Sequence, residues 1–289
     1  MMDLESEPSM DIPPPNPKAL LRQYGLRADK KLGQNFLIDQ SALKRVVRAA
    51  ELTGDETVLE IGAGLGSLTY FLSSVAYRVI AVEFDQRLIN ALDTVLEPLG
   101  NVELIAGDIL SLDIEDLLAG EPYAIVANIP YNITSVLIRR ILESPKSAFR
   151  IVLTVQQEVA ERIVAQPGEY SLLALSVQLY GIPQVMGHIP ARSFYPQPKV
   201  DSAILKIDVH ETPVVDPTLI PILFQLARAA FNQKRKKLRN SISAGMGVET
   251  DTAIAWLNSC GIDPSSRPQE LGVEAWSELA RVVQEDRAN

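Results

Sequence analysis

Short runs rich in valine and isoleucine alternate with helical patterns in the first half of the chain, and this alternation restricts the possible folds more than any other feature. Strands are expected at residues 57–61, 78–83, 102–106, 123–127 and 150–155. Helices are expected between them at residues 67–75, 86–96 and 134–143. The expected strands are almost continuously apolar, as strands are when both faces of a sheet are covered. The pattern predicts an α/β fold with a parallel sheet and helices on both of its faces.

The remainder of the chain divides into three parts. Two strand-like runs, 183–189 and 200–209, have no clear helix between them and predict an antiparallel pair that closes the sheet edge. After a linker that begins at Thr212 the pattern is helical, with helices expected at residues 219–231, 233–243, 250–260 and 273–284. We therefore expect one domain at 18–211 and a small all-α C-terminal domain at 212–289. Residues 1–17 are acidic and rich in proline, and we expect a disordered tail there.

Residue counts exclude several classes of protein. The single cysteine, Cys260, cannot form an internal disulfide, and the two histidines, His188 and His210, offer few ligands for zinc. We therefore expect a reducing cytoplasm and chemistry without a metal. No stretch approaches the ~18 consecutive apolar residues of a membrane helix, and the N-terminal residues are acidic instead of basic. Neither a membrane span nor a signal peptide is expected.

The charge is distributed unevenly along the chain. The formal net charge is −9, which alone disfavours binding to nucleic acid. However, residues 18–50 carry eight Lys and Arg residues against two acids, and residues 217–248 carry six basic residues and no acid. Between them, residues 51–125 carry fourteen acids and two arginines, so much of the negative charge lies in one block. Two basic segments in an acidic chain are what a surface that binds a polyanion requires, although such segments are also common on solvated faces.

A glycine-rich turn, with Gly62, Gly64 and Gly66, follows the first expected strand. Glycines allow a tight strand-to-helix turn and let a ligand approach the backbone closely. The spacing is G-x-G-x-G, whereas the fingerprint of dinucleotide-binding proteins is G-x-G-x-x-G. The spacing therefore favours S-adenosylmethionine, a nucleoside without a pyrophosphate. It disfavours an NAD-dependent dehydrogenase, which is kept as an alternative.

Two acids lie where the second and third expected strands end. Glu83 ends one strand and Asp108 follows the next. Taken alone, each acid is more often a surface residue at a strand end. Together with the glycine turn they converge on the crevice where open α/β sheets bind ligands. There Glu83 can accept hydrogen bonds from both ribose hydroxyls, and Asp108 can accept one from the adenine amino group.

The fourth expected strand ends in the sequence Asn128-Ile129-Pro130-Tyr131, which suits chemistry at an exocyclic amine. The adenine amino group is a poor nucleophile because its lone pair is delocalised into the ring. The Asn128 side-chain oxygen and the Ile129 carbonyl can accept hydrogen bonds from it, and Pro130 helps to aim that carbonyl by fixing φ. Tyr131 offers a flat face to a base lifted from its stack. No general base is expected, since the ammonium formed by methyl transfer loses its proton to water.

These residues resemble the ribosomal RNA adenine N6,N6-dimethyltransferase family, which includes the bacterial dimethyladenosine transferases linked to kasugamycin sensitivity. The similarity extends from about residue 30 to about residue 271. Besides the turns and acids above, it is carried by three segments: KLGQNFL at 31–37, SFYPQPKVDS at 193–202 and AFNQKRKKLRNS at 230–241. The glycine turn occurs in very many methyltransferases, but its combination with QNFL, NIPY and the segment around Phe194 is specific.

The resemblance implies a Rossmann-like sheet that binds S-adenosylmethionine, followed by a helical C-terminal domain. The implied cofactor-binding residues are Asn35, Leu37, Gly62, Gly64, Glu83, Asp108 and Asn128. The implied catalytic residues are Asn128, Ile129, Pro130, Tyr131 and Phe194, of which Phe194 would cover the target base opposite Tyr131. In this family, two adjacent adenosines near the 3′ end of 16S ribosomal RNA each receive two methyl groups during assembly of the 30S subunit. We expect a cytoplasmic monomer.

A cluster of basic residues in the expected C-terminal domain is the candidate contact to RNA. Its members are Lys234, Arg235, Lys236, Lys237 and Arg239. Without the resemblance, a solvated helix face explains the cluster equally well. If it binds RNA, most of its contacts are to phosphates, which position the RNA without reading its sequence. Affinity would then fall steeply with salt.

Two alternatives remain beside a small-subunit dimethyltransferase. One is a large-subunit ribosomal RNA adenine N6-methyltransferase of the antibiotic-resistance type, which the segment 193–202 and the well-formed C-terminal domain disfavour. The other is a non-catalytic ribosome-assembly factor with the same fold. The intact Gly62, Glu83, Asp108, Asn128 and Tyr131 argue against that loss of activity.

Overall fold

The computed structural model describes residues 12–118, 120–131, 133–144, 148–233 and 235–288. Contacts between residues divide the chain into two units. The first contains the residues up to 160 together with 184–209, and the second contains 161–183 together with the residues from 210 onward. The second unit thus includes a stretch that the sequence analysis assigns to the domain before residue 212.

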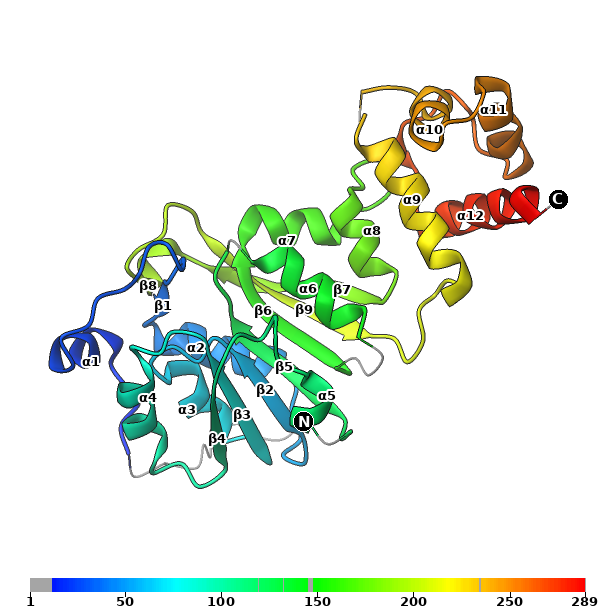
Figure 1. The fold of residues 1–289 in the computed structure, drawn as a ribbon. Coiled ribbons are helices and arrows are strands. Elements are labelled where there is room, and N and C mark those ends of the chain that lie inside the picture. Colours follow the sequence, from blue (N-terminus) through cyan, green and yellow to red (C-terminus); the bar gives the residue numbers. More distant parts are fainter. Residues whose placement is uncertain (1–11, 119, 132, 145–147, 234, 289) are drawn as a thin grey trace. The chain divides into compact units, whose positions relative to one another are not determined.

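A seven-stranded sheet has the strand order β4-β3-β2-β5-β6-β9-β7 (Figure 1). The strands are β2 (Thr57–Ile61), β3 (Arg78–Glu83), β4 (Val102–Ala106), β5 (Tyr123–Asn128), β6 (Arg150–Gln156), β7 (Gly181–Ile189) and β9 (Ser202–Val209). Neighbouring strands from β4 to β6 are parallel, whereas β9 is antiparallel to β6. All residues of β2 are buried, which requires cover on both faces of the sheet. The predicted α/β fold with a mainly parallel sheet is confirmed.

Helices precede the parallel strands of the first unit and connect them. They are α1 (Pro17–Gln23), α2 (Gln40–Ala49), α3 (Ser67–Ser73), α4 (Ile89–Leu96), α5 (Ile114–Leu118) and α6 (Thr134–Leu142), and α7 (Gln157–Val164) leads into the second unit. Helix α2 shows why such a segment is helical. Its N-cap, Asp39, accepts hydrogen bonds from the backbone amides of Ser41 and Ala42, and Leu43 and Val46 are buried on one face.

A two-stranded antiparallel sheet joins distant parts of the chain. It consists of β1 (Phe36–Leu37) and β8 (Phe194–Tyr195), with Leu37 opposite Phe194. The 3-10 helix η1 (Ala191–Ser193) precedes β8, and Ser193 Oγ donates a hydrogen bond to Asp39 Oδ2 at 2.8 Å. The sheet brings together the segments 31–37 and 193–202, which are two of the three that carry the family resemblance.

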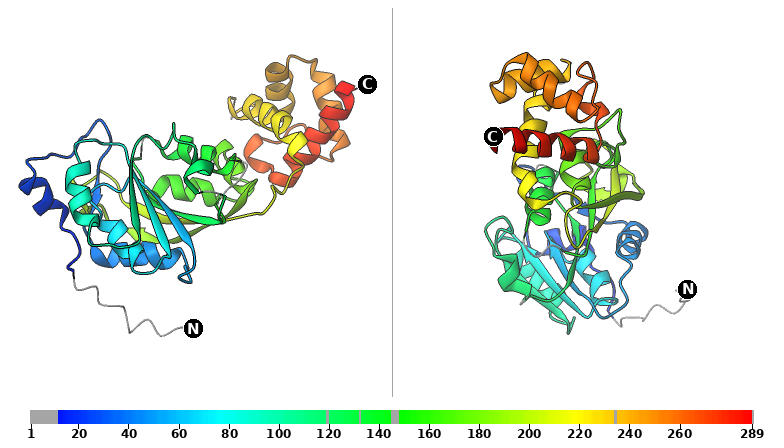
Figure 2. Two further views of the ribbon diagram at one scale, coloured as in Figure 1. Left: turned by 60° about the horizontal axis from the view of Figure 1, so that its bottom comes forward. Right: turned by 90° about the vertical axis from the view of Figure 1, so that its right-hand side faces the viewer.

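The second unit is helical. It contains α8 (Leu172–Gln178), η2 (Pro217–Leu219), α9 (Ile220–Phe231), α10 (Leu238–Met246), α11 (Thr250–Ser259), η3 (Pro268–Glu270) and α12 (Val273–Ala288), and the last four α-helices lie together in the yellow-to-red part of Figure 2. Trp256 and Trp276 are buried in its core. Gly245 allows α10 to approach α9 closely, because a Cβ atom there would lie 2.3 Å from Ala229 Cβ. Among the described residues, no helix has both the length and the apolar character that a membrane crossing requires.

Two expectations from the sequence differ from the structure. Residues 12–17 of the expected tail are held in place: Asn16 Oδ1 caps α1, and the Tyr70 hydroxyl donates to the Ile12 carbonyl at 2.5 Å. Residues 1–11 lie outside the described part of the chain. The helix expected at 233–243 begins only at Leu238, because Lys237 has extended backbone angles. The basic residues before Leu238 therefore precede the helix.

Candidate active site

A cavity of about 220 Å³ lies at the carboxyl ends of β2, β3, β4 and β5. Its wall is formed by the segment before β1, the turn after β2 and the ends of the other three strands. Of the residues expected from the sequence, those that line it are Asn35, Gly62, Gly64, Glu83, Asp108, Asn128, Ile129, Pro130 and Tyr131. The fold thus gathers residues from five separate stretches of the chain around one cavity.

The turn after β2 depends on glycine. Gly62 and Gly64 have φ values of 77° and 63°, in the left-handed region that is strained for other residues. A Cβ atom on Gly64 would also lie 3.2 Å from the Phe36 ring. The Gly62 amide donates to the Val82 carbonyl of β3 at 2.8 Å, which fixes the turn against the neighbouring strand. Bare backbone therefore faces the cavity and leaves room for a ligand.

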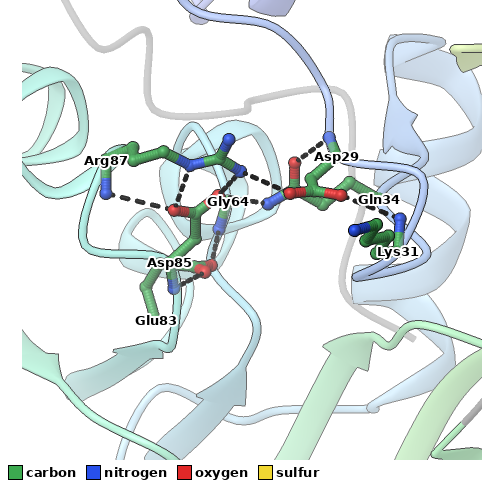
Figure 3. A network of polar contacts seen from close by, with 7 residues as sticks. All are labelled: Asp29, Lys31, Gln34, Gly64, Glu83, Asp85 and Arg87. Carbon is green, nitrogen blue, oxygen red and sulfur yellow. Dashed lines mark hydrogen bonds and ion pairs between the residues drawn. The ribbon is translucent and has the colours of Figure 1, made fainter.

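Glu83, at the end of β3, is held by two backbone amides (Figure 3). Its Oε2 accepts a hydrogen bond from Gly64 N at 2.7 Å, and its Oε1 accepts one from Asp85 N at 2.7 Å. Burial raises the pKa of this carboxyl, and the two amide hydrogen bonds act in the opposite direction. Each oxygen keeps a further lone pair, so the geometry allows both to accept from ribose hydroxyls.

Apolar side chains that the sequence analysis does not name line the cavity beside the two acids. Phe84 follows Glu83 and is 55% exposed, although it is a large aromatic residue. Ile109 and Leu110 follow Asp108, whose Oδ1 accepts a hydrogen bond from the Leu110 amide at 2.9 Å. The signal that could have found them is an apolar residue directly after each acid at a strand end. The exposed ring of Phe84 can stack on a purine.

Asn128 is oriented by the segment that precedes β1. Its Nδ2 donates a hydrogen bond to the backbone carbonyl of Asn35 at 3.1 Å. Asn35 is held in turn by a hydrogen bond from its own Nδ2 to the Gly33 carbonyl at 3.0 Å. With the Nδ2 of the Asn128 carboxamide engaged in this way, its Oδ1 is left to accept a hydrogen bond from a substrate amine. The sequence alone could not reveal this contact.

Tyr131 contributes its ring to the cavity and its hydroxyl to a contact with β9. The hydroxyl forms a hydrogen bond of 2.7 Å with Ser202 Oγ. Burial raises the pKa of Tyr131, so this hydroxyl stays neutral at neutral pH. Ile129 and Pro130 line the cavity next to it. The turn after β5 is thus hydrogen-bonded to β9 through Tyr131, and its residues line the cavity.

Phe194 and Leu37 lie outside this cavity. Phe194 is 2% exposed and packs with Leu37 in a hydrophobic cluster, where the two residues are opposite each other in the β1–β8 pair. The sequence places Phe194 over the target base, opposite Tyr131, whereas the structure places it in the core. Leu37 lines a smaller cavity of about 30 Å³ beside the glycine turn, to which Glu60 and Asn128 also contribute.

The candidate RNA-binding residues lie in the helical unit. Arg235, Lys236 and Lys237 are exposed in the turn before α10, and Arg239 is half-buried in the first turn of that helix. Lys234 lies outside the described residues. The carboxyl of Asp263 lies near Lys237 and Arg239, and hydrogen bonds from Ser265, aided by these two charges, lower the pKa of Asp263.

The groups around the large cavity fit S-adenosylmethionine. A backbone turn without side chains, an anchored carboxylate with free lone pairs, a second carboxylate and an exposed aromatic ring match the ribose, the adenine amino group and the purine face. Within the described stretches, no group of three or more His, Cys, Asp and Glu side chains is placed to hold a metal ion.

Comparison with solved structures identifies proteins of similar fold. A dimethyladenosine transferase from Plasmodium falciparum matches with a TM-score of 0.75 and 25% identity, over 87% of this chain and 98% of that one. The 23S rRNA methyltransferase ErmE matches with a TM-score of 0.69 and 27% identity, over 86% of this chain and 100% of that one.

Curated relatives are more similar in sequence. A protein of Dehalococcoides mccartyi (strain CBDB1) named ribosomal RNA small subunit methyltransferase A is 43% identical over 91% of this chain and 90% of its own length. The protein of the same name from Moorella thermoacetica is 40% identical over 92% of this chain and 96% of its own length. Residues 25–285 match the family model described as ribosomal RNA adenine dimethylase. The chain therefore belongs to the ribosomal RNA adenine dimethylase family.

Proposed function

We propose that the chain transfers methyl groups from S-adenosylmethionine to the N6 atoms of two adjacent adenosines near the 3′ end of 16S ribosomal RNA, two to each adenosine, while the 30S subunit assembles. The observation that carries this proposal is that one cavity is bordered both by the anchored Glu83 carboxylate and by the oriented Asn128 carboxamide. Membership of the family supports the chemistry. The names of the relatives at 40–43% identity support the small subunit as the target.

The cofactor end of the cavity is assigned to the ends of β2, β3 and β4. When bound there, S-adenosylmethionine supplies an electrophilic methyl group. Glu83 binds the ribose hydroxyls, Asp108 accepts from the adenine amino group, and the Phe84 ring covers the purine. Gly62 and Gly64 let the ligand contact the backbone. Asn35 borders the methionine part of the cofactor. Leu37 lies outside the large cavity and lines the small cavity beside the glycine turn, so its effect on the cofactor is indirect.

The reaction end of the cavity is assigned to the turn after β5. Asn128 Oδ1 and the Ile129 carbonyl accept hydrogen bonds from the two N–H groups of the target adenine's amine, which makes its nitrogen more tetrahedral and more nucleophilic. Pro130 fixes the direction of that carbonyl, and the Tyr131 ring supports the base by stacking, a contact worth ~1 to 3 kcal/mol. Positioning is the main catalytic device in this scheme. For Phe194 to cover the base, it must leave its place in the core when RNA binds.

The remaining assignments concern the RNA and the state of the protein. Lys234, Arg235, Lys236, Lys237 and Arg239 bind phosphates of the RNA in the assembling 30S particle. We assign methyltransferase chemistry to residues 18–211 and RNA docking to residues 212–289. The protein acts as a monomer in the cytoplasm, where its substrate is made. Sedimentation of the purified chain tests the monomer.

A second candidate is N6-methylation of adenine in large-subunit ribosomal RNA. The match to the 23S rRNA methyltransferase ErmE favours it, since the matched region covers that whole chain. Its sequence identity of 27% is lower than the 40–43% shared with the small-subunit relatives. The proposal therefore keeps the small subunit as the target.

Labelled S-adenosylmethionine, supplied with four RNA substrates, tests the target. They are under-methylated small subunits, mature small subunits, large subunits and protein-free ribosomal RNA, and the modified bases are mapped by mass spectrometry. We expect N6,N6-dimethyladenosine at two neighbouring positions of the under-methylated small subunit. Label in large-subunit RNA supports the second candidate instead. No transfer to any substrate supports a non-catalytic assembly factor.

An Asn128→Ala variant tests the reaction site in the same assay. It removes an oriented acceptor, and we expect the rate to fall by about 100-fold or more, as for other preorganised polar groups in active sites. Asn258→Ala changes an exposed asparagine of α11 and serves as the control. Transfer by Asn128→Ala at the wild-type rate contradicts the assignment of the amine acceptor.

A further inference from the structure

The segment of residues 29–35 lines the cavity through its last four residues, Leu32 to Asn35. It has little regular structure of its own, so side-chain contacts must determine where it lies. Two such contacts connect it to the loop after β3, one from Gln34 to Asp85 and one from Arg87 to Asp29, and Figure 3 shows them together with the Glu83 carboxylate. They begin at Asp85, whose backbone amide donates to Glu83 Oε1.

The Asp85 carboxylate is 5% exposed and carries several hydrogen bonds. Its Oδ2 accepts from Gln34 Nε2 at 2.8 Å and from an Arg87 Nη atom at 2.6 Å, and its Oδ1 accepts from Arg87 Nε at 2.8 Å. These Arg87 hydrogen bonds lower the pKa of Asp85, so the carboxylate stays charged at neutral pH. Arg87 also reaches Asp29 Oδ2 at 3.3 Å. Arg87 thus balances the charge of Asp85, and the Asp85 carboxylate is oriented toward the segment.

The Gln34 carboxamide makes this contact and is engaged through both its nitrogen and its oxygen. Its Nε2 donates to Asp85, and its Oε1 accepts from the Asp29 amide at 2.8 Å. The Gln34 amide donates to the Asp29 carbonyl at 3.2 Å, which closes the loop from 29 to 34 on itself. The next residue is Asn35, whose carbonyl accepts from Asn128 Nδ2. A continuous path of contacts therefore leads from Glu83 through Asp85, Gln34 and Asn35 to Asn128.

We propose that Gln34, Asp85 and Arg87 are positioning residues that hold the segment 29–35 in place, and thereby set both the cofactor cavity and the orientation of the Asn128 carboxamide. This inference rests on the proposed function for the roles of Glu83 and Asn128. None of the three residues needs to touch the substrate. Their effect is transmitted by two neighbouring residues of the segment. Gln34 contacts Asp85 beside the Glu83 carboxylate, and the carbonyl of Asn35 accepts from Asn128.

Exchanging the hydrogen-bonding groups of Gln34 and Asp85 tests the contact. Gln34→Glu places two carboxylates against each other, whereas the double variant Gln34→Glu/Asp85→Asn restores a hydrogen bond with the donor on the other side. Gln34→Ala removes the contact without adding charge. Gln40→Glu adds the same charge at an exposed position of α2 and is the matched control.

The first readout is binding of S-adenosylhomocysteine to the full-length chain by calorimetry at pH 8. We expect at least tenfold weaker binding for Gln34→Glu and Gln34→Ala, wild-type binding for Gln40→Glu, and recovery to within threefold of wild type for the double variant. Binding within twofold of wild type by both single variants overturns the proposal. So does a double variant that binds as weakly as Gln34→Glu.

The second readout is hydrogen exchange of the peptide that covers residues 29–35, without any ligand. Faster exchange in Gln34→Glu and Gln34→Ala, reversed in the double variant, is expected, and unchanged exchange overturns the proposal. Neither readout uses RNA, so a wild-type chain that binds S-adenosylhomocysteine and methylates no ribosomal RNA refutes the proposed function while this test stands.

The third readout separates positioning from cofactor affinity. With S-adenosylmethionine at saturation, the turnover number of Gln34→Glu stays about tenfold below that of the wild type, because Asn35 no longer orients Asn128. Full turnover at saturation would show that the contact serves the cofactor alone, which overturns the part of the proposal that concerns Asn128.

Discussion

Glu60 is a carboxylic acid buried inside β2, and its replacement by glutamine is expected to stabilise the first unit in a pH-dependent way. The residue is 1% exposed, and its Oε2 has no hydrogen-bond partner among the described atoms. Burial raises the pKa of Glu60 to about 8, and the charge of Glu83 acts in the same direction. The folded chain therefore holds Glu60 protonated at pH 7, whereas the unfolded chain releases the proton. Glutamine has nearly the same shape and no such proton to lose.

The size of the effect follows from the two pKa values. A carboxyl whose pKa rises from 4.5 to about 8 on folding contributes stability that is fully present below pH 4.5 and is lost as the pH rises through 8. At about 1.4 kcal/mol per pH unit, the wild type loses roughly 3 kcal/mol by pH 7 and less than about 1 kcal/mol by pH 5. Glu60→Gln escapes this loss, and its carboxamide can still form a hydrogen bond with the nearby Thr69.

Differential scanning calorimetry at pH 5 and pH 7 measures the difference. A change of 1 kcal/mol shifts Tm by about 2 to 4 °C in a domain of about 150 to 250 residues, so Glu60→Gln raises the Tm of the first unit by roughly 6 to 12 °C at pH 7. At pH 5 the gain is under about 4 °C. Glu97→Gln, at the exposed residue that follows α4, is the control and stays within about 0.5 kcal/mol of wild type. Equal gains at both pH values, or a loss at pH 7, would refute the reasoning.

Three further substitutions test other parts of the structure. Gly66→Ala places a Cβ atom 2.8 Å from a valine methyl of α4 at a φ of 78°, and calorimetry should show the first unit destabilised by about 1 to 3 kcal/mol. Gly245→Ala places a Cβ atom 2.3 Å from Ala229 Cβ in the second unit, which also holds both tryptophans. Denaturant unfolding followed by tryptophan fluorescence should show that the free energy of unfolding falls by at least about 1 to 3 kcal/mol. Unchanged stability in either case contradicts the packing described. Tyr131→Phe keeps the ring and loses the hydrogen bond to Ser202, so kcat should fall up to about tenfold while the Kd of S-adenosylhomocysteine is unchanged.

The sequence was most informative about the parallel strands and the turns that follow them. Strands β2 to β6 agree with the predicted ranges within one residue. For β2, β3, β5 and β6 the reason is that strands buried on both faces are continuous apolar runs. Functional side chains at their carboxyl ends follow from that topology, so Glu83, Asp108 and Asn128 line the cavity as predicted. Their individual roles stay predictions until the variants are measured.

Long-range pairing explains what the sequence did not predict. The strands β1 and β8 have two residues each, so no local pattern identifies them or places Phe194 in the core. The contact of Gln34 with Asp85 likewise depends on a distant loop. Near Lys237, residues with good helix propensity lie in a turn instead, because the backbone amide of Leu238 donates to the Ser266 carbonyl. Tertiary contacts override local propensity there.

The strand order also constrains how a ribosome can produce this fold. Strand β9 lies between β6 and β7, although β7 is synthesised first. Emerging β7 therefore has no neighbour to pair with until β9 follows, about 20 residues and one to a few seconds later at ordinary rates of translation. The strands from β2 to β6 can pair as they emerge, but the edge of the nascent sheet stays unpaired during that interval. An exposed strand edge is a template for pairing with another chain, so this interval is when the nascent protein is most prone to aggregate.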